Sequence, residues 1–133
     1  MLQVLQSTTS TQQSITSTTH ADLTGLSVTI TPASASSKFL IMYSIQFLIQ
    51  SDSAINIKIL RDSTIIVNVG GTTENYNASN DHRGRTVYQY LDAPSTTSAI
   101  TYKLTAGRHY INTVYVNDNS DYQSSITVME IAS

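Results

Sequence analysis

Apolar and polar residues alternate along much of this chain. In the stretch 38–50 the odd positions from Phe39 to Ile49 are all apolar. An alternation with a period of two is typical of a β-strand that buries one face. The same pattern occurs at Leu26, Val28 and Ile30, before Pro32 interrupts it. We therefore expect a strand at 26–30, then a turn, and then the longest strand at 38–50, which should lie at the centre of a sheet.

Further alternating segments follow this long strand. Apolar residues at every second position from 55 to 59 and from 65 to 69 flank the turn formers Arg61, Asp62 and Ser63, and this arrangement predicts a β-hairpin. In the segment 99–106 we expect Ile100, Tyr102 and Leu104 to face inward. The remaining strands are predicted at 2–6, 85–91, 110–116 and 125–131.

The number and spacing of these segments decide the fold class. No segment has a useful helical period, and short strands at regular spacing indicate a β-sandwich or barrel. We predict an all-β fold, a jelly-roll β-sandwich of about 8–10 antiparallel strands. Residues 1–133 are predicted to form one domain. Within it, residues 1–20 are expected to form an N-terminal strand or an arm that grips a neighbour.

Several strands also carry apolar residues on the face opposite the expected core. A sheet that faces water does not need them, so we predict that they form an interface between copies of the chain. The alternative is a register error, in which case some of them point into the core. The predicted interface residues are Leu40, Met42, Leu48, Tyr88, Tyr90, Tyr115 and Met129.

The segment 72–84 has no apolar period and is predicted to be one long surface loop. In and beside it lies the one local gathering of cationic, aromatic and amide side chains. Such a group is suited to a glycan or an acidic protein surface, although it also fits a solvated connection between strands. The candidate binding residues are Tyr76, Asn80, His82, Arg83 and Arg85.

Composition excludes several other classes of function. Charged residues make up 12% of the chain and its net charge is −2, so we expect no nucleic-acid partner. The chain has no cysteine, and therefore no disulfide and no thiolate zinc site. The apolar run 39–49 is too short for a membrane-spanning helix, and the N-terminus has no signal-peptide pattern. We expect a soluble chain without membrane insertion.

No motif indicates catalysis. His20, His82 and His109 are isolated in the sequence, so we expect no metal site and no cofactor. The stretch 118–121 offers oxygen ligands for calcium, but it lacks the glycine and the distal glutamate of a dedicated calcium loop, and Asp and Asn also serve turns. No nucleophile elbow or phosphate-binding loop is present. We therefore expect a structural or binding module and not an enzyme.

Several segments resemble a domain found in structural proteins of tailed bacteriophages, notably marine and cyanobacterial ones. The similarity covers about residues 4–132 and is carried by TGLSVTITPASASSKFLIMYSIQF, the RDST turn at 61–64, YLDAPSTTSAITYKL at 90–104, Tyr110-Ile111-Asn112 and the closing SSITVMEIA. These domains are similar to the trimeric jelly rolls of the complement and tumour-necrosis-factor group.

The resemblance implies a location on the virion and a trimer packed through one sheet face. It predicts a homotrimeric virion protein that decorates or cements the capsid, bound to the major capsid protein or another virion protein. The chain shows no shaft, which favours the capsid surface. The alternative is the tip of a tail fibre that recognises a glycan on the host surface.

Overall fold

The computed structural model of the chain describes residues 1–70, 73–75 and 79–133, with the backbone alone for residues 73 and 74. The described residues form eleven strands in two antiparallel sheets. Sheet A contains β1 (Gln3–Thr9), β2 (Gln13–Ile15), β4 (Lys38–Ile49), β8 (His82–Asp92), β10 (Val114–Val116) and β11 (Ser124–Ile131). Sheet B contains β3 (Ala21–Ile30), β5 (Ser53–Arg61), β6 (Thr64–Asn68), β7 (Thr73–Asn75) and β9 (Ile100–Arg108).

The long strand β4 lies at the centre of sheet A, as predicted. Strand β8 pairs with it along one side, from Phe39 to Ile49. On the other side β11 pairs with residues 38–44 of β4, and β10 pairs with residues 47–49. Strand β1 lies outside β11, and β2 lies outside β10. Residues 1–20 thus supply two paired strands of the sheet.

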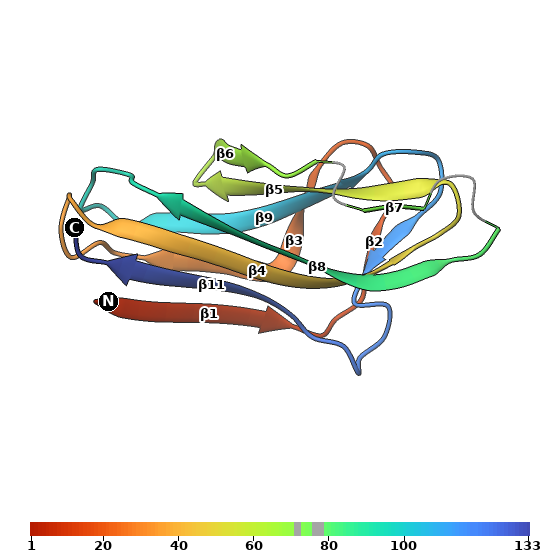
Figure 1. Cartoon of the computed structure of the whole chain (residues 1–133), viewed down its shortest axis with the longest axis horizontal. Coiled ribbons are helices and arrows are strands. Elements are labelled where there is room, and N and C mark those ends of the chain that lie inside the picture. Colours follow the sequence, from red (N-terminus) through yellow and green to blue (C-terminus); the bar gives the residue numbers. More distant parts are fainter. Residues whose placement is uncertain (71–72, 76–78) are drawn as a thin grey trace.

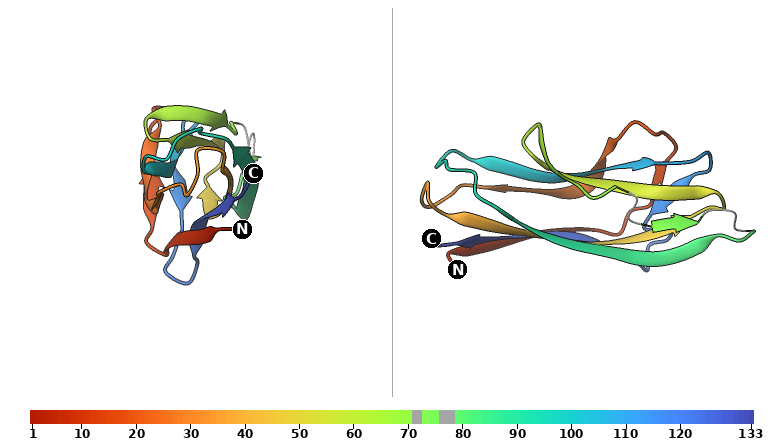
Figure 2. Two further views of the ribbon diagram at one scale, coloured as in Figure 1. Left: turned by 90° about the vertical axis from the view of Figure 1, so that its left-hand side faces the viewer. Right: turned by 45° about the horizontal axis from the view of Figure 1, so that its top comes forward.

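Sheet B has the order β3-β9-β5-β6, with β7 also paired to β5. The predicted hairpin is confirmed, because Arg61 pairs with Thr64 across a turn in which Asp62 has a φ of 54°. The two sheets lie face to face, and both termini lie at the same end of the sandwich (Figures 1 and 2). The predicted all-β fold is confirmed, and its two antiparallel sheets are consistent with a jelly roll.

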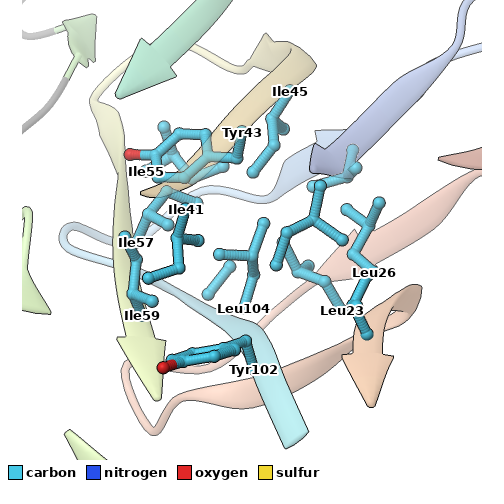
Figure 3. Close-up of a cluster of buried hydrophobic side chains, with 14 of the residues drawn as sticks. Leu23, Leu26, Ile41, Tyr43, Ile45, Ile55, Ile57, Ile59, Tyr102 and Leu104 are labelled. Carbon is cyan, nitrogen blue, oxygen red and sulfur yellow. The ribbon is translucent and has the colours of Figure 1, made fainter. Parts of the chain in front are cut away.

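The core lies between the two sheets and follows the predicted alternation. Figure 3 shows side chains from β3, β4, β5 and β9 gathered in this space. Ile41 and Ile45 of β4 and Ile57 of β5 have no exposed surface. Each fully buried side chain of this size stabilises the fold by about 1.5–3 kcal/mol, so the alternating isoleucines hold the sheets together.

Some predicted boundaries were wrong. The short strand β2 lies beyond the predicted strand 2–6, and β10 covers only the last three residues of the predicted strand 110–116. The predicted loop 72–84 contains β7 and the first residues of β8. Gly84 belongs to β8 because it pairs with Phe47, and a Cβ on Gly84 would lie 2.9 Å from the Phe47 ring. This glycine therefore makes room for a core side chain and does not mark a turn.

A buried polar network fills the fork where β10 and β11 separate along β4. The Gln46 N–H donates to the Ser124 hydroxyl (3.0 Å), and the Gln46 carbonyl accepts from the Asn117 N–H (3.0 Å). The Asn117 side chain accepts from Ser124 (2.7 Å) and donates to the carbonyl of Thr9 (3.0 Å). These contacts satisfy backbone groups that neither neighbouring strand reaches, so the network fixes where β1 and β10 end and where β11 begins.

Candidate functional site

The outer face of sheet A carries a row of apolar side chains that crosses four strands. Val4 of β1 pairs with Met129 of β11, Met129 pairs with Leu40 of β4, and Leu40 pairs with Leu91 of β8. Directly paired residues of an antiparallel ladder project on the same face of the sheet. We call this set, Val4, Met129, Leu40 and Leu91, the apolar row.

Exposed apolar surface continues from this row along β8. Leu91 is 50% exposed and Val87 is 66% exposed, while Val4 at the other end of the row is 44% exposed. Met42, Val87 and Gln89 line part of a shallow groove of about 540 Å³ beside the row. On one side of the row the paired side chains Gln89 and Thr127 are polar but uncharged, whereas the exposed Lys38, which pairs with Ile131, lies on the other side. The row and the side that carries Gln89 and Thr127 are therefore suited to a partner with an uncharged surface.

The predicted interface residues divide between the two faces. Leu40, Met42, Leu48, Tyr115 and Met129 lie on the outer face of sheet A, although Leu48 is only 7% exposed. Their role in an interface stays a prediction.

The structure corrects the placement of the two tyrosines of β8. Tyr88 pairs with Tyr43 and Tyr90 pairs with Ile41, so both lie on the inner face. Tyr90 packs against the core, and the rings of Tyr88 and Tyr43 stack with their centroids 6.3 Å apart. Sequence reasoning assigned β8 to the wrong register because both of its faces carry apolar residues. It therefore missed Val87 and Leu91, and it also missed Val4.

Arg83 and Arg85 lie at the opposite end of the same outer face. The Arg83 Nε lies 2.5 Å from Oδ2 of Asp118, and this contact raises the pKa of Arg83. The Arg85 Nη1 donates to the Ser44 hydroxyl and to the Gln123 carbonyl, both at 2.9 Å. A hollow of about 330 Å³ lies beside these arginines and Tyr122. Both guanidinium groups already have partners within the chain.

The other predicted binding residues do not gather around these arginines. His82 begins β8 on the inner face, where its ring lies 5.8 Å from that of Phe47. Asn80 is exposed, and its carbonyl accepts a hydrogen bond from the Asn75 side chain (2.8 Å). Tyr76 lies outside the described residues. The prediction of a surface loop was wrong for His82 and Arg83, because pairing with β4 extends the strand through them, whereas Arg85 lies in the strand as predicted.

In the stretch 118–121, both carboxylate oxygens of Asp118 have partners within the chain. Gln46 donates to Oδ1 of Asp118 (2.6 Å), and Arg83 contacts the other oxygen. The backbone N–H of Asp121 donates a hydrogen bond to the side-chain oxygen of Asn119 (2.8 Å), as in an ordinary turn. Within the described residues, no three His, Cys, Asp or Glu side chains are grouped so that they could hold a metal ion. In the same residues no helix is long and apolar enough to cross a membrane.

Comparisons with known proteins give a distant likeness among solved structures. No protein-family model matches the chain, and no curated protein matches it. Among solved structures, the chain is similar to one from "Structure of infectious bursal disease virus Gt strain", with 10% identity and a TM-score of 0.46. The match covers 98% of this chain but 38% of that one, so this chain spans less than half the length of its relative. A likeness at this level carries no inference about function, and the predicted relation to phage jelly rolls stays a prediction.

Proposed function

We propose that this chain is a bacteriophage virion protein that assembles as a homotrimer through the outer face of sheet A and decorates the capsid surface. The observation that carries the proposal is the apolar row across β1, β11, β4 and β8. The sequence resemblance to trimeric phage jelly rolls supports the same assignment. The proposed role is structural and binding, without catalysis.

The composition of the face favours a second copy of the chain as its occupant. In a chain that carries few charges, a partner with an uncharged, partly apolar surface is provided by the same face of another copy. Burial of Val87, Leu91 and Val4 in such a contact would remove apolar area from water, which stabilises association by about 25 cal/mol for each Å². In a trimer one part of this face contacts a different part of the neighbouring copy's face, so three such head-to-tail contacts around one axis form a closed ring.

The first experiment is the mass of the purified chain by light scattering at several concentrations. We expect three times the 14.5 kDa of a single chain. A mass of one chain across the concentration range would contradict the trimer. Mass spectrometry of purified virions and immunogold labelling then test the location. A signal spread over the capsid supports decoration, whereas absence from virions contradicts the proposal.

A second candidate function is the tip of a tail fibre that binds a host glycan. The hollow beside Arg83, Arg85 and Tyr122 favours this alternative, because Arg83 is exposed and Tyr122 offers a ring for a sugar. The internal partners of both arginines weigh against it. Immunogold label at the fibre ends, together with a glycan-array signal that Arg85→Ala abolishes, would support the fibre tip over the capsid.

A further inference from the structure

A polar pocket of about 390 Å³ lies on the outer face of sheet B. It is lined mainly by Thr18, His20, Asn56, Lys58, Asn68 and His109. These residues come from four places in the sequence that only the fold brings together. Its size falls within the range of small-ligand sites.

The floor of the pocket follows from the strand register. Lys58 of β5 lies between Asn68 of β6 and Thr105 of β9, and Asn56 lies beside Gly107 of β9. Paired residues share a face, so a lysine and two amides are arranged side by side. Oδ1 of Asn68 accepts from the Gly70 N–H (3.1 Å), which leaves the amide nitrogen of Asn68 as its donor toward a ligand.

One wall of the pocket is the connection between β2 and β3, and it is held in place by the end of β9. Arg108 donates from its backbone N–H to the Ser17 carbonyl (2.9 Å) and from Nε to the Thr16 carbonyl (2.8 Å). Nδ1 of His20 lies 3.2 Å from the Thr105 hydroxyl. A Cβ on Gly107 would lie 2.9 Å from the His20 ring and 3.0 Å from the Thr18 carbonyl, so glycine permits this close approach. The wall is therefore built before any ligand binds.

Lys58 is a cation that takes part in none of the ion pairs among the described side chains. Asp22 of β3 lies on the same face beside Thr105, but it pairs with Lys103 at 3.2 Å. Burial, followed by the charge of Lys58, lowers the pKa of His20. At neutral pH the imidazole is therefore uncharged and offers one donor and one acceptor.

We propose that this pocket binds the carboxylate of an acidic sugar. The Lys58 ammonium provides one positive charge for a single carboxylate, and a charge-assisted hydrogen bond of this kind is among the stronger polar contacts. The amide nitrogen of Asn68 and the neutral imidazole of His20 contact the hydroxyl groups of the ring. A doubly charged phosphate group fits less well, because the pocket offers one cation. The proposal does not depend on the trimer.

The test is a titration of the whole chain followed by ¹H–¹⁵N spectra, with glucuronic acid, glucose and acetate as probes. We expect glucuronic acid to shift the amide signals around His20, Lys58 and Gly107, and glucose and acetate to bind at least about tenfold more weakly, a ratio equivalent to about 1.4 kcal/mol. Equal binding of glucose would overturn the role of the carboxylate. Equal binding of acetate would overturn the role of the sugar ring. No shift with glucuronic acid would overturn the site.

Two matched variants test whether the Lys58 ammonium binds the carboxylate of glucuronic acid. Lys58→Gln removes the ammonium but keeps most of the side-chain stem, and we expect it to weaken glucuronic acid binding about tenfold or more. Lys103→Gln removes a cation from the same sheet face that already has a partner, and binding should stay unchanged. Thermal unfolding of both variants checks that they are folded. An equal loss in the two variants, or no loss in Lys58→Gln, would contradict the assignment.

Discussion

Arg61 at the end of β5 places its Nη1 atom 2.8 Å from both carboxylate oxygens of Asp92 at the end of β8. The two residues belong to different sheets, so this ion pair ties sheet B to sheet A. The Tyr102 hydroxyl of β9 donates to the same carboxylate at 2.7 Å. Asp92 is 6% exposed, and a buried carboxylate is tolerated when such donors surround it. One end of the sandwich is therefore closed by a polar cluster and not by apolar packing.

Removal of the tyrosine hydroxyl tests this cluster. In Tyr102→Phe the buried carboxylate loses one donor while the ring still fills the core, so we expect the free energy of unfolding to fall by about 1.5–3 kcal/mol. Urea denaturation measures the change. Tyr122→Phe, at a partly exposed tyrosine in the connection before β11, should change stability by less than about 0.5 kcal/mol. Equal effects in the two variants would show that the Tyr102–Asp92 bond adds nothing specific.

Sequence periodicity predicted the parts of the fold where one face is apolar and the other is polar. Residues 55–59, for example, alternate isoleucine with polar residues, and the isoleucines are buried as predicted. Strand β8 was misassigned because Val87, Tyr88, Tyr90 and Leu91 put apolar groups on both faces. Only pairing with β4 settles which residues point outward. The pocket on sheet B could not be predicted, since it joins residues as distant as His20 and His109 that share no local motif.

The carboxyl group of Glu130 should make the free energy of unfolding depend on pH in the acidic range. Burial raises the pKa of its carboxyl, but hydrogen bonds from Gln3 (2.6 Å) and the Ala33 N–H (2.7 Å) outweigh burial, and the net pKa lies below the ordinary 4.5. The unfolded chain then binds this proton more readily than the folded one. The resulting stabilisation is present above about pH 4.5 and is lost as the pH falls through the lower folded-state pKa.

Glu130→Gln therefore has a predicted signature. The variant should be less stable than the wild type at pH 7, and the difference should shrink as the pH falls below about 4. Unfolding curves in urea at a series of pH values measure this difference. Asp121→Asn, at an exposed carboxylate, provides the control and should leave the pH profile unchanged. A constant difference between Glu130→Gln and the wild type across the pH range would contradict the linkage.

Charge on the apolar row should dissociate the proposed trimer. Leu91→Lys places an ammonium on a side chain that is 50% exposed in the single chain, so folding should be little affected, whereas burial of the charge between copies is costly. We expect the mass measured by light scattering to fall toward one chain. Ile111→Lys, at a position that is 78% exposed in the connection between β9 and β10, should remain trimeric. A trimeric Leu91→Lys would place the interface elsewhere.

Asn117 should contribute much more to stability than the nearby ion pair of Arg83 and Asp118. It is fully buried, has a φ of 54°, and its side chain bridges Ser124 and Thr9. Asn117→Ala leaves these two partners without their hydrogen bonds and strains the backbone, so we expect the free energy of unfolding to fall by about 2–4 kcal/mol. Asn117→Gly relieves the backbone but not the lost hydrogen bonds, so it should be intermediate. Arg83→Ala removes a guanidinium whose side chain is 60% exposed, and in urea denaturation it should cost less than Asn117→Ala.

Gly84 provides the last prediction, because its neighbour fills the space that a side chain would need. A Cβ there would lie 2.9 Å from the Phe47 ring, and that ring is only 2% exposed and cannot move outward freely. Gly84→Ala should therefore destabilise the chain by about 1–3 kcal/mol through overpacking. Gly70→Ala, whose nearest contact is the side chain of Asn68 on an exposed segment, should be close to neutral.

A double variant separates overpacking from an intrinsic preference for glycine. Phe47→Leu removes ring atoms that the new methyl group would meet, so Gly84→Ala should cost less in the Phe47→Leu background than in the wild type. The coupling measured by the double-mutant cycle should reach about 0.5–3 kcal/mol, as is usual for residues in contact. If the two effects simply add, Gly84 is required for its backbone and not for the room that it leaves for the Phe47 ring.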